Sequence, residues 1–159
     1  MINNDILRRI RYAFDFSDAK MVAIFGQADC QVTREQINGW LKKEDDPEFV
    51  KCSDTQLAIF LNGLINELRG KKEGEQPKPE NRLTNNLILR KLKIALELKS
   101  EDMLEIMDQS SVSISKHELS AFFRKPDHPH YRLCKDQILR NFIDGLRLRY
   151  RNSDQLKKS

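Results

Sequence analysis

The basic residues in the second half of the chain are the group whose types and spacing best fit a binding site, in this case one for phosphates. Arginine and lysine neutralise phosphates, and polar side chains on a helix can read base edges. The candidate nucleic-acid-binding residues are Arg90, Lys91, Lys93, Lys116, His117, Ser120, Arg124, Lys125, Arg140 and Arg147. We expect DNA or RNA as a partner of this half, although ordinary solvated helix faces would also explain such charges.

The net charge differs between the two halves of the chain. The 159 residues carry 28 Lys and Arg against 24 Asp and Glu. Residues 1–70 hold nine basic and eleven acidic residues, a net charge of −2, whereas residues 83–159 hold fifteen and ten, a net charge of +5. Four carboxylates crowd residues 44–48, where they would repel a phosphate backbone. The nucleic-acid prediction therefore applies to the second half, where Arg132, Arg149 and Arg151 could add contacts.

Potential metal ligands are gathered in one short segment, which contains Asp127, His128, His130 and Cys134. The spacing is not that of a structural zinc site, and the matching segment of the first half has Cys52 but no histidine. Small buried thiols leading into a helix explain both cysteines, and three cysteines in all fit reduced thiols. We expect no metal and no cofactor.

Catalytic motifs are not found in the sequence. It contains no G-x-S-x-G elbow, no phosphate-binding glycine loop, no H-E-x-x-H and no recognisable Cys–His dyad. Acid pairs such as Glu101 and Asp102 stand at expected helix starts, where capping and helix-dipole effects explain them. We therefore expect a protein that is not an enzyme.

The sequence contains one unit twice. An offset of 82 aligns residues 3–70 with 85–152 without a gap. Residues 70–82 between the copies are all polar or glycine and proline, which is typical of a solvated linker. The expected organisation is a first repeat at 1–70, a linker at 71–82, a second repeat at 83–152 and a polar tail at 153–159.

Apolar positions shared by both copies have helical spacing throughout. They predict an all-α fold, a tandem duplication of a unit of roughly four helices, with no strand. The expected helix starts are an N-cap at Asn4 or Asn86, then Asp18 or Ser100, then the capping boxes Thr33–Gln36 or Ser115–Glu118, then about Asp54 or Asp136. The third helix is expected to stop at a loop that contains Pro47 in the first copy and Pro126 and Pro129 in the second.

Helices two and three of each repeat resemble a helix-turn-helix, with the third as the recognition helix. In the second repeat Lys116, His117 and Ser120 would face a groove. Trp40 and Phe122 fall at core spacing on this helix. Gly63 and Gly145 lie within the fourth helix, where glycine costs about 1 kcal/mol relative to alanine, and predict a close helix crossing.

The alternative function is a protein–protein interaction adaptor or a homo-oligomeric module. Two similar units could pack about a pseudo-two-fold axis and leave a groove for a partner, or pair with a second chain. Phe49 and Tyr131, matched across the copies, would pin their loops or contact such a partner.

Several stretches are similar to the YehS-like family of uncharacterised bacterial proteins. They are NNDILRRIRYA, INGWLKKEDDPEF and LAIFLNGL in the first copy, and NNLILRKLKIA, FFRKPDH and FIDGL in the second. The resemblance covers nearly the whole chain and implies two copies of one small helical domain. It brings no biochemical activity, cofactor or catalytic residue to carry over.

The expected location is the cytoplasm, without a membrane. The longest apolar stretches, near residues 21–25 and 57–61, fall far short of the roughly 20 residues that a membrane-spanning helix needs. The N-terminus has an acid followed by arginines rather than the basic start and apolar run of a secretory signal.

Overall fold

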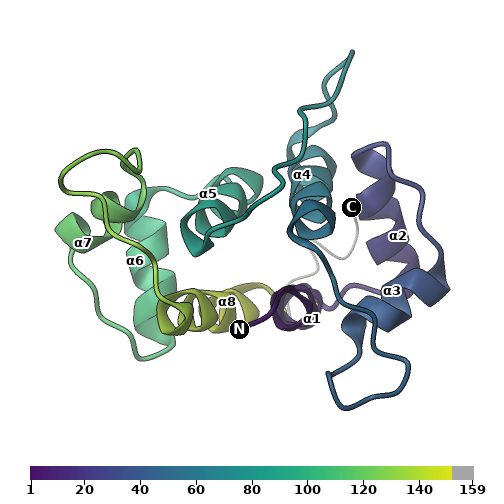
Figure 1. The fold of residues 1–159 in the computed structure, drawn as a ribbon. Helices are drawn as coiled ribbons and strands as arrows, with labels where there is room; N and C mark the ends of the chain where they lie inside the picture. Colours follow the sequence, from purple (N-terminus) through teal and green to yellow (C-terminus); the bar gives the residue numbers. More distant parts are fainter. Residues whose placement is uncertain (152–159) are drawn as a thin grey trace.

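The computed structural model describes residues 1–151, and this range contains eight helices and no strand (Figure 1). The predicted tail at 153–159 lies outside the described residues. The helices are α1 (Asn3–Phe14), α2 (Asp18–Gln27), α3 (Arg34–Leu41), α4 (Asp54–Arg69), α5 (Asn85–Ala95), α6 (Ser100–Gln109), α7 (Lys116–Phe122) and α8 (Asp136–Tyr150). The all-α prediction with four helices in each repeat is confirmed.

The two repeats meet through two pairs of helices, α1 with α8 and α4 with α5 (Figure 1). We call the surfaces along these pairs the α1/α8 seam and the α4/α5 seam. Each pair runs in parallel, and the contacts across one seam recur at positions 82 residues away across the other. The equivalent contacts are Met1–Asp136 and Leu83–Asp54, Arg9–Asp144 and Lys91–Asn62, and Arg151–Asp15 and Arg69–Glu97. The repeats are therefore related by an approximate two-fold axis.

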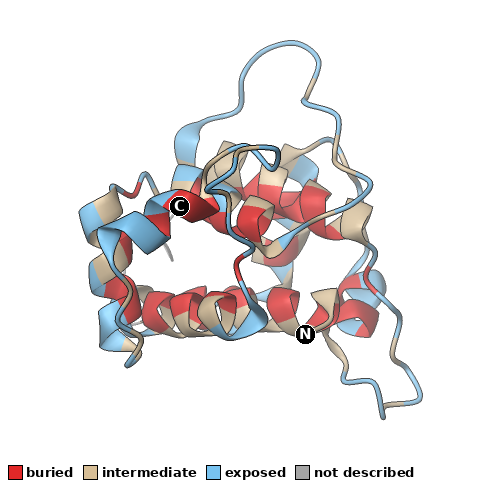
Figure 2. Cartoon of the chain, turned by 60° about the vertical axis from the view of Figure 1, so that its left-hand side comes forward, coloured by how far each residue is buried: buried red, intermediate tan, exposed pale blue. Residues whose placement is uncertain are grey.

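Buried side chains of both repeats form one hydrophobic core (Figure 2). The red positions in that view lie on the facing sides of the helices, as the shared apolar pattern predicts. Trp40 and Phe122 are both buried, which confirms their assignment to the core. Because α1 and α4 bury apolar surface against α8 and α5, each repeat supplies part of the other's core.

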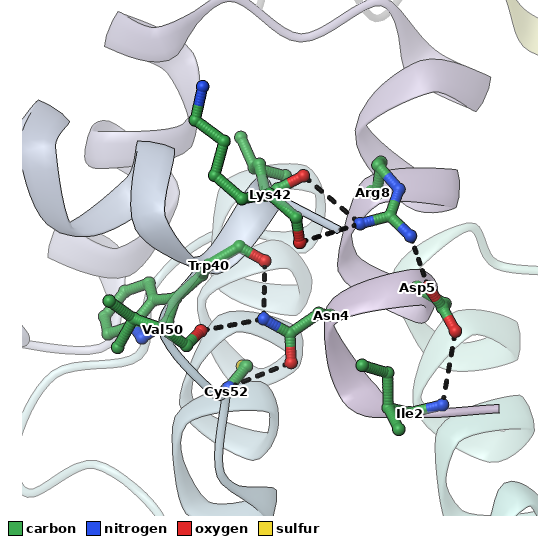
Figure 3. A network of polar contacts seen from close by, with 9 residues as sticks. Ile2, Asn4, Asp5, Arg8, Trp40, Lys42, Val50 and Cys52 are labelled. Atoms are coloured by element: carbon green, nitrogen blue, oxygen red, sulfur yellow. Dashed lines mark hydrogen bonds and ion pairs between the residues drawn. The ribbon is translucent and has the colours of Figure 1, made fainter. Parts of the chain in front are cut away.

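The prediction that Asn4 and Asn86 cap their helices is wrong. The N-caps are Ile2 and Thr84, and both asparagines lie inside the first turn, buried. The Asn4 amide donates to the Trp40 and Val50 carbonyls at 2.9 and 2.8 Å and accepts from the Cys52 N–H at 3.0 Å (Figure 3). The equivalent bonds of Asn86 reach Phe122, Arg132 and Cys134. A buried amide that satisfies three backbone groups ties the loop to the helix in each repeat.

The third helix of each repeat ends at the loop that contains Pro47 or Pro129, as predicted. Helix α3 ends at Leu41 and α7 at Phe122. At the end of α3, the guanidinium of Arg8 donates hydrogen bonds to the Leu41 and Lys42 carbonyls, each at 3.2 Å (Figure 3). Arg90 does the same for the carbonyl of Phe123 at 2.8 Å. Carbonyls at a helix end lack intrahelical partners, and these arginines supply them.

Gly63 and Gly145 mark close helix crossings, as predicted. A Cβ at Gly63 would lie 2.0 Å from the Ile24 carbonyl oxygen of α2, and one at Gly145 would lie 2.2 Å from that of Ile106 in α6. Only glycine permits this approach of α4 to α2 and of α8 to α6, which offsets the helix-propensity cost.

The connection between helices two and three differs from a standard helix-turn-helix. It spans residues 28–33 in the first repeat and 110–115 in the second, longer than the three or four residues of that motif. Helix α7 is itself short. The likeness is thus limited to the order of the helices. Among the described residues, no helix is both long and apolar enough to cross a bilayer.

Candidate nucleic-acid interface

Helix α7 and the loop after it line a pocket of about 580 Å³. Its polar and aromatic lining is contributed by His117, Glu118, Arg124, His130, Tyr131 and Arg132. A second hollow of about 450 Å³ beside Ser115, Lys116, His117 and Ser120 shares His117 with it. The two hollows therefore adjoin at His117 and bring residues that are separate in the sequence to one side of the second repeat.

Backbone and capping contacts hold this pocket in place. The Arg132 N–H donates to the Ala121 carbonyl at 3.2 Å, and the Asn86 amide donates to the Arg132 carbonyl at 2.7 Å. The capping box of α7 fixes its first turn, because Ser115 Oγ accepts from the Glu118 N–H. The Glu118 carboxylate accepts in return from the Ser115 N–H at 3.2 Å, so the pocket's one lining carboxylate already has a donor.

The side chain of Arg124 lies at the base of this surface with hydrogen-bonding capacity left over. Its Nε is buried and has no hydrogen-bond partner within residues 1–151. Its Nη1 lies 3.5 Å from His128 Nε2, while His128 Nδ1 accepts from the His130 N–H at 3.0 Å. A neutral imidazole whose Nδ1 accepts carries its proton on Nε2, so two N–H groups then face each other. An oxygen of an anionic ligand would supply the missing acceptor.

The structure brings five of the ten predicted residues to this surface. Lys116, His117, Ser120 and Lys125 are exposed there, and Lys116 lies 3.7 Å from Glu101. Arg90 and Lys93 approach the neighbouring Phe123, with the Lys93 ammonium 4.8 Å from its ring centroid. We define the α7 surface as Lys116, His117, Ser120, Arg124, Lys125, His130 and Arg132. His130 was absent from the predicted set because its loop position carries no periodic signal.

Besides Arg90 and Lys93, three further predicted residues are left out of the α7 surface, because they lie elsewhere. The Lys91 side chain is only 12% exposed, with its Nζ 2.6 Å from Asn62 Oδ1 and 3.1 Å from Glu80 Oε1. Arg147 lines the α1/α8 seam. Arg140 donates to Gln137 on α8 at 2.8 Å. Lys91 and Arg147 lie on the faces of α5 and α8 that meet the first repeat, which the sequence of one repeat does not reveal.

Both repeats of the chain match the same protein family. The family described as "Protein of unknown function (DUF1456)" matches residues 3–70 and again 85–152. The chain belongs to this family. It is 44% identical over 150 residues to "Uncharacterized protein YehS" of Escherichia coli (strain K12), covering 94% of this chain and 96% of that protein. No solved structure matches.

Both repeats of this chain contain a buried cysteine at the same position, Cys52 and Cys134. The Cys134 N–H is bound by Asn86, and its thiol lies 3.7 Å from the Lys135 carbonyl. Burial, with a smaller effect of Asp136, raises the pKa of Cys134 to about 12, and burial with Asp54 nearby does the same for Cys52. His128 and His130 lie side by side with ring centroids 5.6 Å apart. Within residues 1–151 no three His, Cys, Asp or Glu side chains form a cluster suited to a metal.

Proposed function

We propose that the protein is a non-enzymatic, cytoplasmic nucleic-acid-binding protein that uses the α7 surface of its second repeat. The observation that carries this proposal is the convergence of Arg124, Arg132, His117 and His130 on one pocket. Neither arginine forms an ion pair within residues 1–151, so both can neutralise phosphates. The unpartnered Arg124 Nε favours an oxygen ligand at the same point.

The first repeat offers a natural comparison, because its fold is the same and its side chains differ. The positions of His117, His130 and Arg132 are occupied there by Glu35, Glu48 and Val50. Two carboxylates would repel phosphate where the second repeat has two histidines. The proposal therefore confines binding to the second repeat, in agreement with the difference in net charge.

A single strand suits this surface better than the major groove of a duplex. Helix α7 is short, and the loop 123–132 stands beside its exposed face, which limits how deeply the helix could enter a groove. A single strand can bend a phosphate into the pocket and stack a base on an aromatic ring. Tyr131 is the aromatic side chain that lines the pocket. We expect single-stranded DNA or RNA to bind at least as tightly as duplex.

Fluorescence anisotropy of the full chain with labelled single-stranded and duplex oligonucleotides tests the proposal. The titrations are made at about 50 and about 200 mM salt, because phosphate neutralisation makes affinity fall steeply with salt. Arg124→Gln and Arg132→Val should each weaken binding and lower the log–log salt slope by about 1. Lys42→Gln, which changes the first-repeat equivalent of Arg124, is the matched control and should leave binding unchanged.

Two results would overturn the proposal. One is the lack of any binding at low salt. The other is binding that Arg124→Gln and Lys42→Gln reduce equally, since that would indicate attraction to overall charge rather than to the α7 surface. Circular dichroism of each variant separates a loss of contacts from a loss of fold.

A further inference from the structure

The polar linker is solvated only in its first part: residues 71–75 are exposed and project away from the helices, whereas the following residues return beside α4 to the start of α5 (Figure 1). The Glu80 carboxylate is 3.1 Å from Lys91 Nζ, and Gln76 Oε1 accepts from Asn66 Nδ2 at 2.7 Å. Pro79 and Glu80 are half-buried, in a stretch without helix or strand. An extended segment of the chain thus already lies on one of the two equivalent seams. Its Glu80 carboxylate contacts Lys91 of α5, the first helix of the second repeat.

No such segment among residues 1–151 covers the equivalent α1/α8 seam, which is hollowed instead. Two adjoining pockets of about 310 and about 220 Å³ lie along it and share Arg8 and Tyr12. Tyr12 is 55% exposed. Within residues 1–151 this seam is therefore left uncovered, and the Tyr12 ring lies where the two pockets adjoin.

This seam has an excess of one positive charge, that of Arg147. Of the five arginines in the pocket walls, Arg9 and Arg151 lie 3.8 and 3.6 Å from the lining aspartates, and Arg8 and Arg11 pair with Asp5 and Asp18 at the edges. Arg147 forms no ion pair within residues 1–151 and replaces the Ile65 of the sister seam. The lining cations are Arg8, Arg9, Arg11, Arg147 and Arg151, and the lining acids are Asp15 and Asp144.

We propose that the α1/α8 seam binds an extended acidic peptide segment of a partner protein, in the way that the chain's own linker lies on the α4/α5 seam. A carboxylate of the peptide would bind Arg147 and Arg9, and an apolar side chain would pack on Tyr12. Polypeptide is favoured over nucleic acid because the occupant of the equivalent seam is a polypeptide, and because Asp15 and Asp144 would repel a continuous row of phosphates. This site is separate from the α7 surface and does not rest on nucleic-acid binding.

The test uses the full chain and a fluorescent peptide of residues 70–82 in which Lys71, Lys72 and Lys78 are replaced by glutamate. A peptide in which the three glutamates of this segment are instead replaced by lysine is the charge-reversed control. We expect binding of the acidic peptide alone, weakened by salt. Arg147→Ile, which installs the side chain of the sister seam, should weaken it about tenfold, the effect of one charge-assisted hydrogen bond. Tyr12→Ala should also weaken it.

Arg140→Gln, on the same helix but outside the seam, should leave peptide binding unchanged. Binding that is lost equally in Arg147→Ile and Arg140→Gln, or no binding of the acidic peptide, overturns the proposal. So does a labelled single-stranded oligonucleotide that binds in place of the peptide and loses affinity in Arg147→Ile. Thermal melting of Arg147→Ile shows whether the fold is intact; if it is not, Arg147→Gln replaces it in the same comparison.

Discussion

The N-terminal ammonium of Met1 donates a 2.8 Å hydrogen bond to the carboxylate of Asp136, at the first residue of α8. Eighty-two residues away, the Leu83 N–H donates to Asp54 at the same 2.8 Å. Each repeat thus binds the start of the other repeat's fourth helix. An aspartate in the first turn of a helix also interacts favourably with the helix dipole, so both contacts fix the ends of the parallel pairs.

Asp136 should make stability depend on pH. The hydrogen bond from the N-terminal ammonium and one from Asn85 hold the pKa of this carboxyl below its usual range. A depressed folded-state pKa stabilises the protein above the unfolded value, about 3.9, and this contribution is lost as pH falls through the folded-state pKa. Denaturant unfolding between neutral and acidic pH should therefore show a smaller acid-induced loss in Asp136→Asn. The prediction is contradicted if Asp136→Asn loses as much unfolding free energy on acidification as the original chain. It is also contradicted if Asp127→Asn, a control at an exposed site, shows the same reduced loss.

Gly63→Ala should lower the free energy of unfolding by about 2–3 kcal/mol, as overpacking between elements does. The new methyl would lie 2.0 Å from a backbone oxygen of α2, so the two helices must separate. Gly26→Ala is the matched control, because nothing lies within 4 Å of its Cβ position. It should be neutral or stabilising by about 0.5 kcal/mol through helix propensity. Equal stabilities in chemical denaturation would disprove the close crossing.

Asn4→Ala should destabilise the protein by about 3 kcal/mol, because it leaves the buried Cys52 N–H and two carbonyls without their partner. Asn38→Ala, at an exposed position of α3, should change stability by only about 0.5 kcal/mol. Urea unfolding measures both. If the two variants unfold at the same midpoint, the loop is not held by this amide.

The cysteines should differ in reactivity. Burial raises the pKa of Cys52 and Cys134 to about 12, so almost no thiolate forms at neutral pH, whereas Cys30 is only half-buried. We expect iodoacetamide to modify Cys30 first in the native chain and the other two only on unfolding. Mass spectrometry of time points gives the order, and early labelling of Cys134 would contradict the structure.

Neither repeat should be a stable monomer alone, because each lends part of its core to the other. Residues 83–151 expressed separately should unfold or self-associate, as light scattering and circular dichroism would show. A protease site placed in the exposed segment 71–75 provides the control. After cleavage the two halves should still elute together, and separation into two folded monomers would refute the shared core.

The sequence predicted what depends on local signals repeated in both copies. The eight helices, the capping boxes and the crossings at Gly63 and Gly145 follow from periodicity and residue type. The role of Asn4 was mistaken because an asparagine before an apolar run is a common N-cap, and its partners lie 36 to 48 residues away. The basic surface was predicted in part, since Lys91 and Arg147 meet the other repeat and no periodicity reports which helix faces cross between repeats.

The approximate two-fold axis has an electrostatic consequence. Two identical subunits would have to present equal charges on both sides of the shared core. Joining the repeats in one chain removes that constraint, and here residues 1–70 carry −2 while residues 83–159 carry +5. The lobes of α2–α3 and of α6–α7 lie at opposite ends of the molecule (Figure 1), so the chain has a permanent dipole along its length. Such a dipole would turn the positive end toward an approaching polyanion.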